Sequence, residues 1–350
     1  MKKRIVILCG GKSGEHPISC VSAASVARTL KDSYQITPVG ITRSGEWVSL
    51  SLDEVCSWNL KDLPEIEAEG RQKVEAVPGS GLFLAGSKVE ADLVFPVLHG
   101  LGGEDGAVQG FLETCGLPYV GCGIFASAAC MDKHYTKLIL KASGIKVAPG
   151  ITVDARGGVD GPAALEKIRE EKIGWPVFVK PAWGGSSVGV AKVESPEGLE
   201  GALEAAAKVS WRILIEEGIK GREIECAVLQ RRGGKPVAAL PGEIIPSASA
   251  SFYDFEAKYV DTSLCKVKVP ADLDVQTSDA IRREAVKAFE AVDGRQLMRV
   301  DFFLKDDGGI LVNEINTMPG FTEISMYPLA WQSLGMSYRQ ILVDLVENAA

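Results

Sequence analysis

The sequence lacks the long apolar segments and the cysteine patterns that mark several common protein classes. No apolar run in the 350 residues approaches the roughly 20 residues of a membrane-spanning helix, and the longest candidates are short runs such as 5–9. The apolar stretch after the basic N-terminus is too short for a secretory signal and has no small-residue cleavage site. The eight cysteines are scattered, without a Cys-x-x-Cys pair or a histidine at zinc-finger spacing. We therefore expect a cytoplasmic protein with reduced thiols and no membrane partner.

Excess positive charge and the common nucleotide-binding signatures are missing as well. Lys and Arg number 38 against 46 Asp and Glu, which gives a formal net charge of −8 and argues against a nucleic-acid-binding protein. The Walker A ending and the Gly-x-Gly-x-x-Gly fingerprint are both absent. The apolar share of 46% and the charged share of 24% are those of an ordinary folded protein. At about 150 residues per domain, the length predicts two or three domains.

The first third of the chain has the pattern of a doubly wound α/β domain. A buried strand over 4–9 leads into a Gly-rich turn at 10–14, and residues 19–31 then show helical spacing. A second buried strand over 91–98 leads into another Gly-rich loop and a helix over 106–115. We expect residues 1–121 to form this domain, with 53–86 as a peripheral excursion rather than part of the core.

The remainder predicts two α+β units, a central one over 122–218 and a C-terminal one over 219–350. In the central unit we expect a single helix over 127–143 that contains Lys133. Further on, the pattern predicts strands over 175–180 and 211–216 and a helix over 199–209. Strand signals resume after Gly221 and end in a hairpin and a C-terminal helix.

The hairpin at 298–316 carries the most informative pattern. Two apolar strands flank Asp306-Asp307-Gly308-Gly309, so we expect a tight turn of two or four residues. Either length places Asp301 opposite Glu314 and Arg299 opposite Asn316. Because side chains alternate between faces, these four residues share one face, while Val300, Phe302 and Ile315 project from the other.

Two carboxylates opposed across a strand pair repel each other, so a cation is expected between them. The hard oxygen atoms of Asp301, Glu314 and Asn316 suit Mg²⁺ or Mn²⁺. The alternative is a solvated polar face on a surface hairpin.

Two lysines and a Gly-rich loop are candidate phosphate contacts. Lys180 ends an apolar strand, where an ammonium group needs an anionic partner. The following loop, 184–189, is either a phosphate-binding loop or a flexible turn. Lys133 lies either on a solvated helix face or in the site.

Six ordered motifs resemble those of the D-alanine-D-alanine ligases of the ATP-grasp superfamily, and the resemblance spans the chain. The motifs occupy 10–19 (GGKSGEHPIS), 99–106 (HGLGGEDG), 131–133 (MDK), 180–189 (KPAWGGSSVG), 252–259 (FYDFEAKY) and 313–322 (NEINTMPGFT). The resemblance implies a pre-ATP-grasp domain followed by a two-lobed ATP-grasp fold. It also implies peptidoglycan-precursor synthesis and a homodimer formed through the N-terminal domains.

The resemblance implies that ATP binds between the two lobes and that Asp301, Glu314 and Asn316 bind two Mg²⁺ ions, with Mn²⁺ as a substitute. Lys133 and Lys180 then contact the phosphates, and Glu223 the ribose. The full implied nucleotide set is Lys133, Lys180, Gly185, Ser186, Ser187, Glu216, Glu217, Ile219, Glu223, Phe252, Lys258, Asn313 and Glu314.

The same resemblance implies that one D-alanine carboxylate attacks the γ-phosphate and that the amine of a second D-alanine displaces phosphate from the acyl phosphate. Arg299 and the backbone N–H of Gly320 match the oxyanion donors. The implied substrate and catalytic residues are Glu15, His99, Ser186, Lys258, Tyr259, Arg299, Gly320, Ser325 and Met326. Of these, Glu15, Ser186 and Tyr259 match a hydrogen-bonded trio.

Several alternatives and departures stand beside this interpretation. Tyr259 and the apolar Met326 favour D-alanine at the second subsite, whereas D-serine or D-lactate is the alternative acceptor. Another ATP-grasp carboxylate-amine ligase and a catalytically silent nucleotide-binding protein are the other candidates. Pro17 and Glu217 depart from the usual family pattern, and Glu15 also fits a simple role as an acid at a helix N-terminus.

Overall fold

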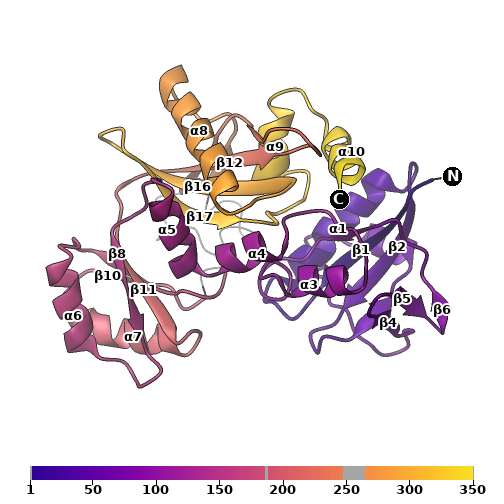
Figure 1. Cartoon of the computed structure of the whole chain (residues 1–350), viewed down its shortest axis with the longest axis horizontal. Helices are drawn as coiled ribbons and strands as arrows, with labels where there is room; N and C mark the ends of the chain where they lie inside the picture. Colours follow the sequence, from indigo (N-terminus) through magenta and orange to yellow (C-terminus); the bar gives the residue numbers. More distant parts are fainter. Residues whose placement is uncertain (1, 186–187, 247–264, 350) are drawn as a thin grey trace.

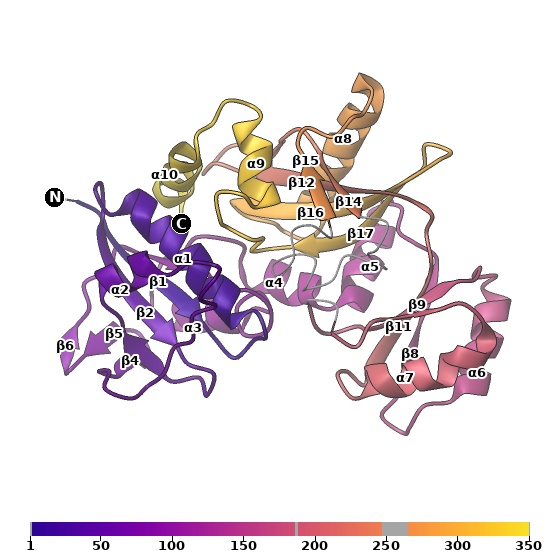
Figure 2. The same cartoon turned by 180° about the vertical axis from the view of Figure 1, so that it is seen from behind.

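The computed structural model describes residues 2–185, 188–246 and 265–349. Figures 1 and 2 show the N-terminal sheet at one side of the molecule and a smaller central lobe at the other, with the C-terminal sheet between and above them. Within these described ranges, no helix is long and apolar enough to cross a membrane.

The N-terminal sheet has the parallel core expected of a doubly wound domain. Its strands lie in the order β3-β2-β1-β7, and β1 is parallel to both neighbours. Ile5 and Ile7 pack into one apolar cluster and Val6 and Leu8 into another, so β1 is covered on both faces, as its continuous apolar run predicts. The elements of this region are β1 (Arg4–Gly10), α1 (His16–Leu30), β2 (Gln35–Ile41), β3 (Trp47–Ser49), β7 (Leu93–Pro96) and α3 (Ala107–Thr114).

The expectation that 53–86 stays outside the core is wrong. This stretch holds most of α2 (Leu52–Ser57) together with a small antiparallel sheet of β4 (Val74–Val77), β5 (Gly81–Leu84) and β6 (Ser87–Lys88). Val55 and Ile66 are buried in one N-terminal cluster, and Val74 and Leu82 in the other. These apolar side chains are too widely spaced to give a periodic signal, yet each covers part of the main sheet.

The central lobe is a four-stranded antiparallel sheet in the order β10-β9-β11-β8 with two helices on it. It has its own apolar cluster, to which both α6 and α7 contribute buried residues. Its elements are β8 (Gly150–Asp154), α6 (Gly161–Glu170), β9 (Val177–Pro181), β10 (Ala191–Val193), a 3₁₀ turn (Pro196–Gly198), α7 (Leu199–Ala207) and β11 (Arg212–Glu217).

The single helix expected over 127–143 is in fact two helices, α4 (Ile124–Met131) and α5 (Lys133–Ala142). Asp132 separates them with an extended backbone, and its carboxylate accepts hydrogen bonds from the N–H groups of His134 and Tyr135. An aspartate with these bonds is an N-cap, which favours a helix start at this position. Lys133 is therefore the first residue of α5.

The C-terminal sheet runs in the order β15-β14-β12-β16-β17, with β13 paired to β12. Val300, Phe302 and Ile315 lie on its buried face in one apolar cluster with Phe289 of α8, as the hairpin pattern predicts. The elements are β12 (Gly221–Leu229), β13 (Val237–Ala238), β14 (Gly242–Pro246), β15 (Cys265–Lys268), α8 (Val275–Ala291), β16 (Leu297–Lys305), β17 (Ile310–Asn316), α9 (Met326–Gln332) and α10 (Tyr338–Asn348).

The hairpin turn differs from both expected lengths, although the pairing of the acidic residues is confirmed. Lys305 and Gly309 close a three-residue loop in which Gly308 has φ +83°. Pairs near the turn, such as Phe302 with Val312, are therefore shifted by one residue from the expected register. An irregularity between Asp301 and Phe302 skips Asn313 and restores the pairs Asp301 with Glu314 and Arg299 with Asn316. Without that extra residue, Glu314 would lie on the buried face.

The N-terminal sheet and the end of the chain share one apolar core. Phe321, Tyr327 and Ile341 pack in the same cluster as Ile5 and Phe95. Figures 1 and 2 both show α10 against the N-terminal region. This shared core fixes the segment after β17 relative to the N-terminal loops.

Candidate active site

Two cavities meet between the three parts of the molecule. One, of about 490 Å³, lies between the central lobe and the C-terminal sheet. The other, of about 690 Å³, lies between the N-terminal loops and the C-terminal sheet. Lys133, Gly184, Glu225 and Glu314 line both. A molecule in the first cavity can therefore present one end to a molecule in the second.

The residues of the implied nucleotide set that the structure describes line the smaller cavity. They include Lys180, Glu216, Ile219, Glu223 and Asn313. Glu217, which departs from the usual family pattern, lines it as well.

Glu216 forms the buried charge centre of this cavity. Lys180 Nζ lies 2.9 Å from Glu216 Oε2, a diagonal contact across the antiparallel pair β9 and β11. Burial alone would raise the pKa of Glu216, but Lys137 and Lys180 together outweigh burial and leave that pKa below its usual value.

Lys133 is held at the start of α5 by the Gly-rich segment. Its Nζ donates to the carbonyl of Gly184 at 2.7 Å, and its backbone N–H donates to the carbonyl of Ala182 at 2.8 Å. The side chain thus lies where the two cavities join. This position favours the functional interpretation of Lys133 over a solvated helix face.

Arg299 and three acidic residues form a charged cluster on the open face of the C-terminal sheet. The Arg299 guanidinium makes two hydrogen bonds of 2.7 Å to Asp301, and its Nε lies 3.0 Å from Glu225 Oε2. Asn316 Nδ2 donates to Asp301 Oδ2 at 2.9 Å. Glu314 lies opposite Asp301 in the strand pair. A guanidinium is thus paired with Asp301, one of the two carboxylates between which the sequence analysis expects a cation.

The donor chemistry of this face fits a divalent metal ion. Asp301, Glu314 and Asn316 offer carboxylate and amide oxygens, which Mg²⁺ and Mn²⁺ prefer. Among the described residues, no three His, Cys, Asp or Glu side chains form a complete metal site. Because bound Mg²⁺ commonly draws further ligands from phosphates and water, two carboxylates and one amide oxygen are compatible with such an ion.

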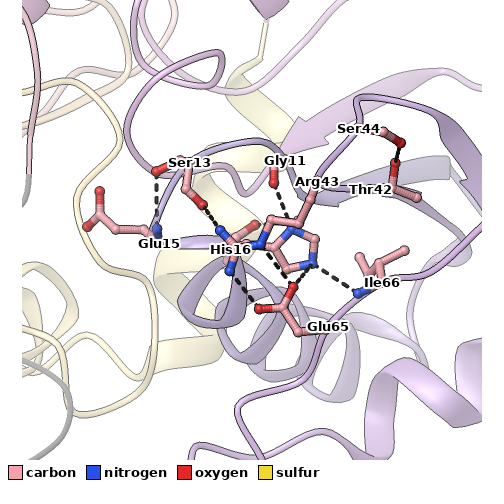
Figure 3. Close-up of polar contacts among 11 residues, drawn as sticks. Gly11, Ser13, Glu15, His16, Thr42, Arg43, Ser44, Glu65 and Ile66 are labelled. Atoms are coloured by element: carbon pink, nitrogen blue, oxygen red, sulfur yellow. Dashed lines mark hydrogen bonds and ion pairs between the residues drawn. The ribbon is translucent and has the colours of Figure 1, made fainter. Parts of the chain in front are cut away.

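The loop after β1 presents Glu15 to the larger cavity, which is called the substrate cavity from here on. Arg43 donates to the carbonyl of Ser13 at 2.6 Å and pairs with Glu65. His16 Nδ1 donates to the carbonyl of Gly11 at 2.7 Å. Figure 3 shows the carboxylate of Glu15 pointing away from this network.

Glu15 is the N-cap of α1, but its side chain makes no capping hydrogen bond, which argues against a purely helix-capping role. Gly100 and Gly185 both approach its carboxylate, since a Cβ on either would lie within 4 Å of Oε2. The departure Pro17 lies in the first turn of α1, where a missing N–H costs no helical hydrogen bond.

Two side chains from the N-terminal part of the chain, His99 and Glu104, hold the backbone of Met318 by hydrogen bonds, and this pair of contacts is called the clamp. His99 Nδ1 donates to the Met318 carbonyl at 3.1 Å, and the Met318 N–H donates to Glu104 Oε1 at 3.2 Å. The other nitrogen of His99, Nε2, lies 3.1 Å from the Ser22 hydroxyl, which can donate to it when the ring is neutral. Burial lowers the pKa of His99, which agrees with a neutral ring.

The clamp rigidly positions the segment that carries Gly320. The carbonyl of Phe321 accepts from the Tyr338 hydroxyl at 2.7 Å, and the ring of Phe321 is fully buried. The backbone around Gly320, which lines the substrate cavity, is therefore fixed on both sides before any ligand binds.

Ser325 and Met326 line the same cavity at the start of α9. Ser325 Oγ accepts from the Thr322 N–H at 3.1 Å. Met326 packs directly over Gly242 of β14, where a Cβ would lie 2.2 Å from its sulfur. A side chain at position 242 would thus displace Met326.

Five residues of the predicted site, Ser186, Ser187, Phe252, Lys258 and Tyr259, lie outside the described residues. Their implied roles stay predictions.

The structure also brings in three titratable residues that the sequence analysis did not place in the site: Glu104, Lys137 and Glu225. Glu225 follows Glu223 at the two-residue spacing of a strand, and Lys137 follows Lys133 at the four-residue spacing of a helix. Both spacings are visible in the sequence and could have indicated these residues.

Two family models match this chain. The model described as D-ala D-ala ligase N-terminus covers residues 4–122, and the model described as D-ala D-ala ligase C-terminus covers residues 139–347.

Curated and solved relatives match over nearly the whole chain. The D-alanine-D-alanine ligase of Bifidobacterium adolescentis is 48% identical over 99% of both chains. The structure of the D-alanine-D-alanine ligase from Coxiella burnetii is similar with a TM-score of 0.86 and 34% identity, covering 99% of this chain and 93% of that one. The VanG D-Ala:D-Ser ligase from Enterococcus faecalis is similar with a TM-score of 0.85 and 33% identity over 99% of both chains.

The carboxyl of Glu104 predicts a pH dependence of stability. Burial, together with the negative charge of Glu15, raises its pKa to about 8. Between the unfolded pKa and about pH 8 the folded chain binds the extra proton, so raising the pH favours the unfolded state.

We expect the unfolding free energy of the wild type to fall, relative to Glu104→Gln, by up to about 1.4 kcal/mol per pH unit in this window. Urea unfolding of both proteins at pH 6, 7 and 8 measures the difference. Parallel stability curves would contradict the account of this carboxyl.

Proposed function

Because this chain belongs to the D-alanine-D-alanine ligase family, we propose that it joins two D-alanine molecules into D-alanyl-D-alanine and converts ATP to ADP and phosphate. The chain is an enzyme with an ATP-grasp fold. The observation that carries the proposal is the junction of the two cavities at Lys133, Glu225 and Glu314. It allows the γ-phosphate of a nucleotide in one cavity to meet a carboxylate in the other.

In this proposal ATP lies between the central lobe and the C-terminal sheet. Lys133 and Lys180 contact the phosphates, while Glu216, Ile219 and Glu223 face the adenosine part. Glu217 helps to hold the segment 216–219 in place, since its Oε2 accepts from the Gly174 N–H at 3.1 Å. Lys133 and Lys180 in the wall of the cavity favour a polyphosphate over an uncharged ligand.

Asp301, Glu314 and Asn316 would hold two Mg²⁺ ions, or Mn²⁺ in their place. Ions bound there would neutralise the phosphate oxygens. The support is the shared face of these three residues and their hard oxygen donors.

The substrate cavity supplies the groups that the ligation needs. Glu15 binds the amine of the first D-alanine, and Ser325 receives the carboxylate of the second. The first carboxylate attacks the γ-phosphate to give an acyl phosphate, and the second amine then displaces phosphate through a tetrahedral intermediate. Arg299 and the N–H of Gly320 stabilise the developing oxyanion. The clamp on Met318 supports this role, because donors fixed in advance need not reorganise during the reaction.

D-Serine is the second candidate acceptor. The structure named D-Ala:D-Ser ligase matches this chain with nearly the same TM-score as the structure named D-alanine-D-alanine ligase. Met326 in the wall of the cavity favours a methyl group, which an apolar contact accepts without an unpaired hydroxyl. A silent nucleotide-binding protein is disfavoured because Arg299, Asp301 and Glu314 are all present and share one face.

Domain limits of 1–121, 122–218 and 219–350 also belong to this proposal. The separate apolar cluster of the central lobe supports the middle unit. The family resemblance supports a homodimer and a cytoplasmic site of peptidoglycan-precursor synthesis.

The direct test is phosphate release with Mg²⁺-ATP and D-alanine. Parallel reactions contain L-alanine, D-alanine with D-serine, D-alanine with D-lactate, or no amino acid. We expect stereospecific release with D-alanine and the dipeptide in the mass spectrum. A higher kcat/KM for D-serine or D-lactate as acceptor would overturn the substrate assignment, and no release from folded, ATP-binding protein would overturn the ligase assignment.

Glu314→Ala tests the metal face. Loss of this ligand should lower kcat by about a hundredfold or more while the protein stays folded. Asp306→Ala, an exposed carboxylate in the turn of the same hairpin, is the matched control and should keep wild-type turnover. Retained activity in Glu314→Ala would refute the assignment.

A further inference from the structure

Lys137 is a buried lysine to which neither the sequence motifs nor the proposed reaction gives a role. It lies on α5, one helical turn after Lys133, and only 6% of the residue is exposed. A lysine is almost never buried to this extent unless its ammonium group is paired. Its partners therefore indicate what the residue does.

The ammonium group of Lys137 contacts two residues that line the smaller cavity, Glu216 and Asn313. Its Nζ lies 2.5 Å from Glu216 Oε1, at the end of β11. The same Nζ donates to the carbonyl of Asn313 in β17 at 3.2 Å. One side chain thus connects α5, the central lobe and the C-terminal sheet.

The first contact makes Glu216 a carboxylate shared by two lysines. Lys180 holds Oε2 and Lys137 holds Oε1, and Glu216 itself is 2% exposed. If Glu216 had Lys180 alone, movement of that lysine toward a phosphate would leave a buried carboxylate without a partner, which is strongly unfavourable. With Lys137 in place, Glu216 stays neutralised, and the repulsion between the two ammonium groups favours release of Lys180.

The second contact holds the extra residue of the hairpin. Asn313 is skipped in the pairing of β16 with β17, and this skip returns Glu314 to the face of Asp301. β17 is an edge strand of its sheet, so its outward carbonyl groups need partners from elsewhere. Lys137 supplies one for Asn313.

We propose that Lys137 is a positioning residue for the nucleotide: it neutralises Glu216 when Lys180 turns to a phosphate, and it holds the bulge that aims Glu314. This inference rests on the proposed function, because it takes Lys180 as a phosphate contact.

The test measures nucleotide binding by calorimetry without any amino acid, so it can be read whatever the acceptor substrate is. The variants are Lys137→Met, which keeps the apolar stem, and Lys141→Met, an exposed control one turn further along α5. The ligands are the Mg²⁺ complex of the β,γ-imido analogue of ATP, and adenosine. For Lys137→Met we expect the affinity for the triphosphate analogue to fall about tenfold or more, with adenosine binding unchanged. Lys141→Met should bind both ligands as the wild type does.

An equal loss of affinity for the triphosphate analogue and for adenosine would show that Lys137 has a merely structural role. Unchanged affinity for the analogue would show that Lys137 has no role in nucleotide binding. Either result overturns the proposal. Lys137→Arg, which keeps the charge, should restore most of the affinity.

If Lys137→Met does not fold, Glu216→Gln/Lys137→Met is compared with Glu216→Gln alone. Because the buried carboxylate is gone from both, only the contact of Lys137 with Asn313 still differs between them, so we expect a further loss of affinity for the analogue of less than about threefold. A tenfold further loss would contradict the compensation by Lys137. Failure of the wild type to bind the triphosphate analogue would instead count against the proposed function itself.

Discussion

The opposition of Asp301 and Glu314 on one face of a hairpin is the constraint on which the rest of the site depends. Like charges at this spacing destabilise a strand pair, and Glu225 adds a third carboxylate from the neighbouring strand. Arg299 compensates part of this charge by binding both Asp301 and Glu225. In the proposed reaction a magnesium-nucleotide complex would add positive charge to this face, since bound metal ions neutralise carboxylates and phosphates together.

The N-terminal part of the chain fixes the segment that follows the hairpin and carries Gly320. Phe321 packs in the N-terminal core, and His99 and Glu104 hold both polar groups of the Met318 backbone. The apolar core and the substrate cavity therefore depend on the same contacts. A change that loosens the core near Phe321 would also move Gly320, so the proposed reaction links stability and catalysis at this junction.

Local patterns predicted much of this arrangement, and its failures have physical causes. The apolar run of β1 and the alternation around Asp301 are properties of neighbouring residues, and both are confirmed. The three-residue turn and the skipped Asn313 each shift the register by one residue, so their effects cancel at Asp301 and leave no trace in the alternation. Lys137 contacts a carbonyl 176 positions away, a contact that helix periodicity alone does not reveal. The break at Asp132 was missed because an N-cap aspartate between two apolar helices resembles a polar residue within one.

The most direct test of this account is a crystal structure with a non-hydrolysable ATP analogue and Mn²⁺, in which anomalous scattering locates the metal ions. The account predicts Mn²⁺ bound to oxygen atoms of Asp301, Glu314 and Asn316, with the Arg299 guanidinium no longer in its two-bond contact with Asp301. Mn²⁺ bound elsewhere, with the contact between Arg299 and Asp301 intact, would contradict it.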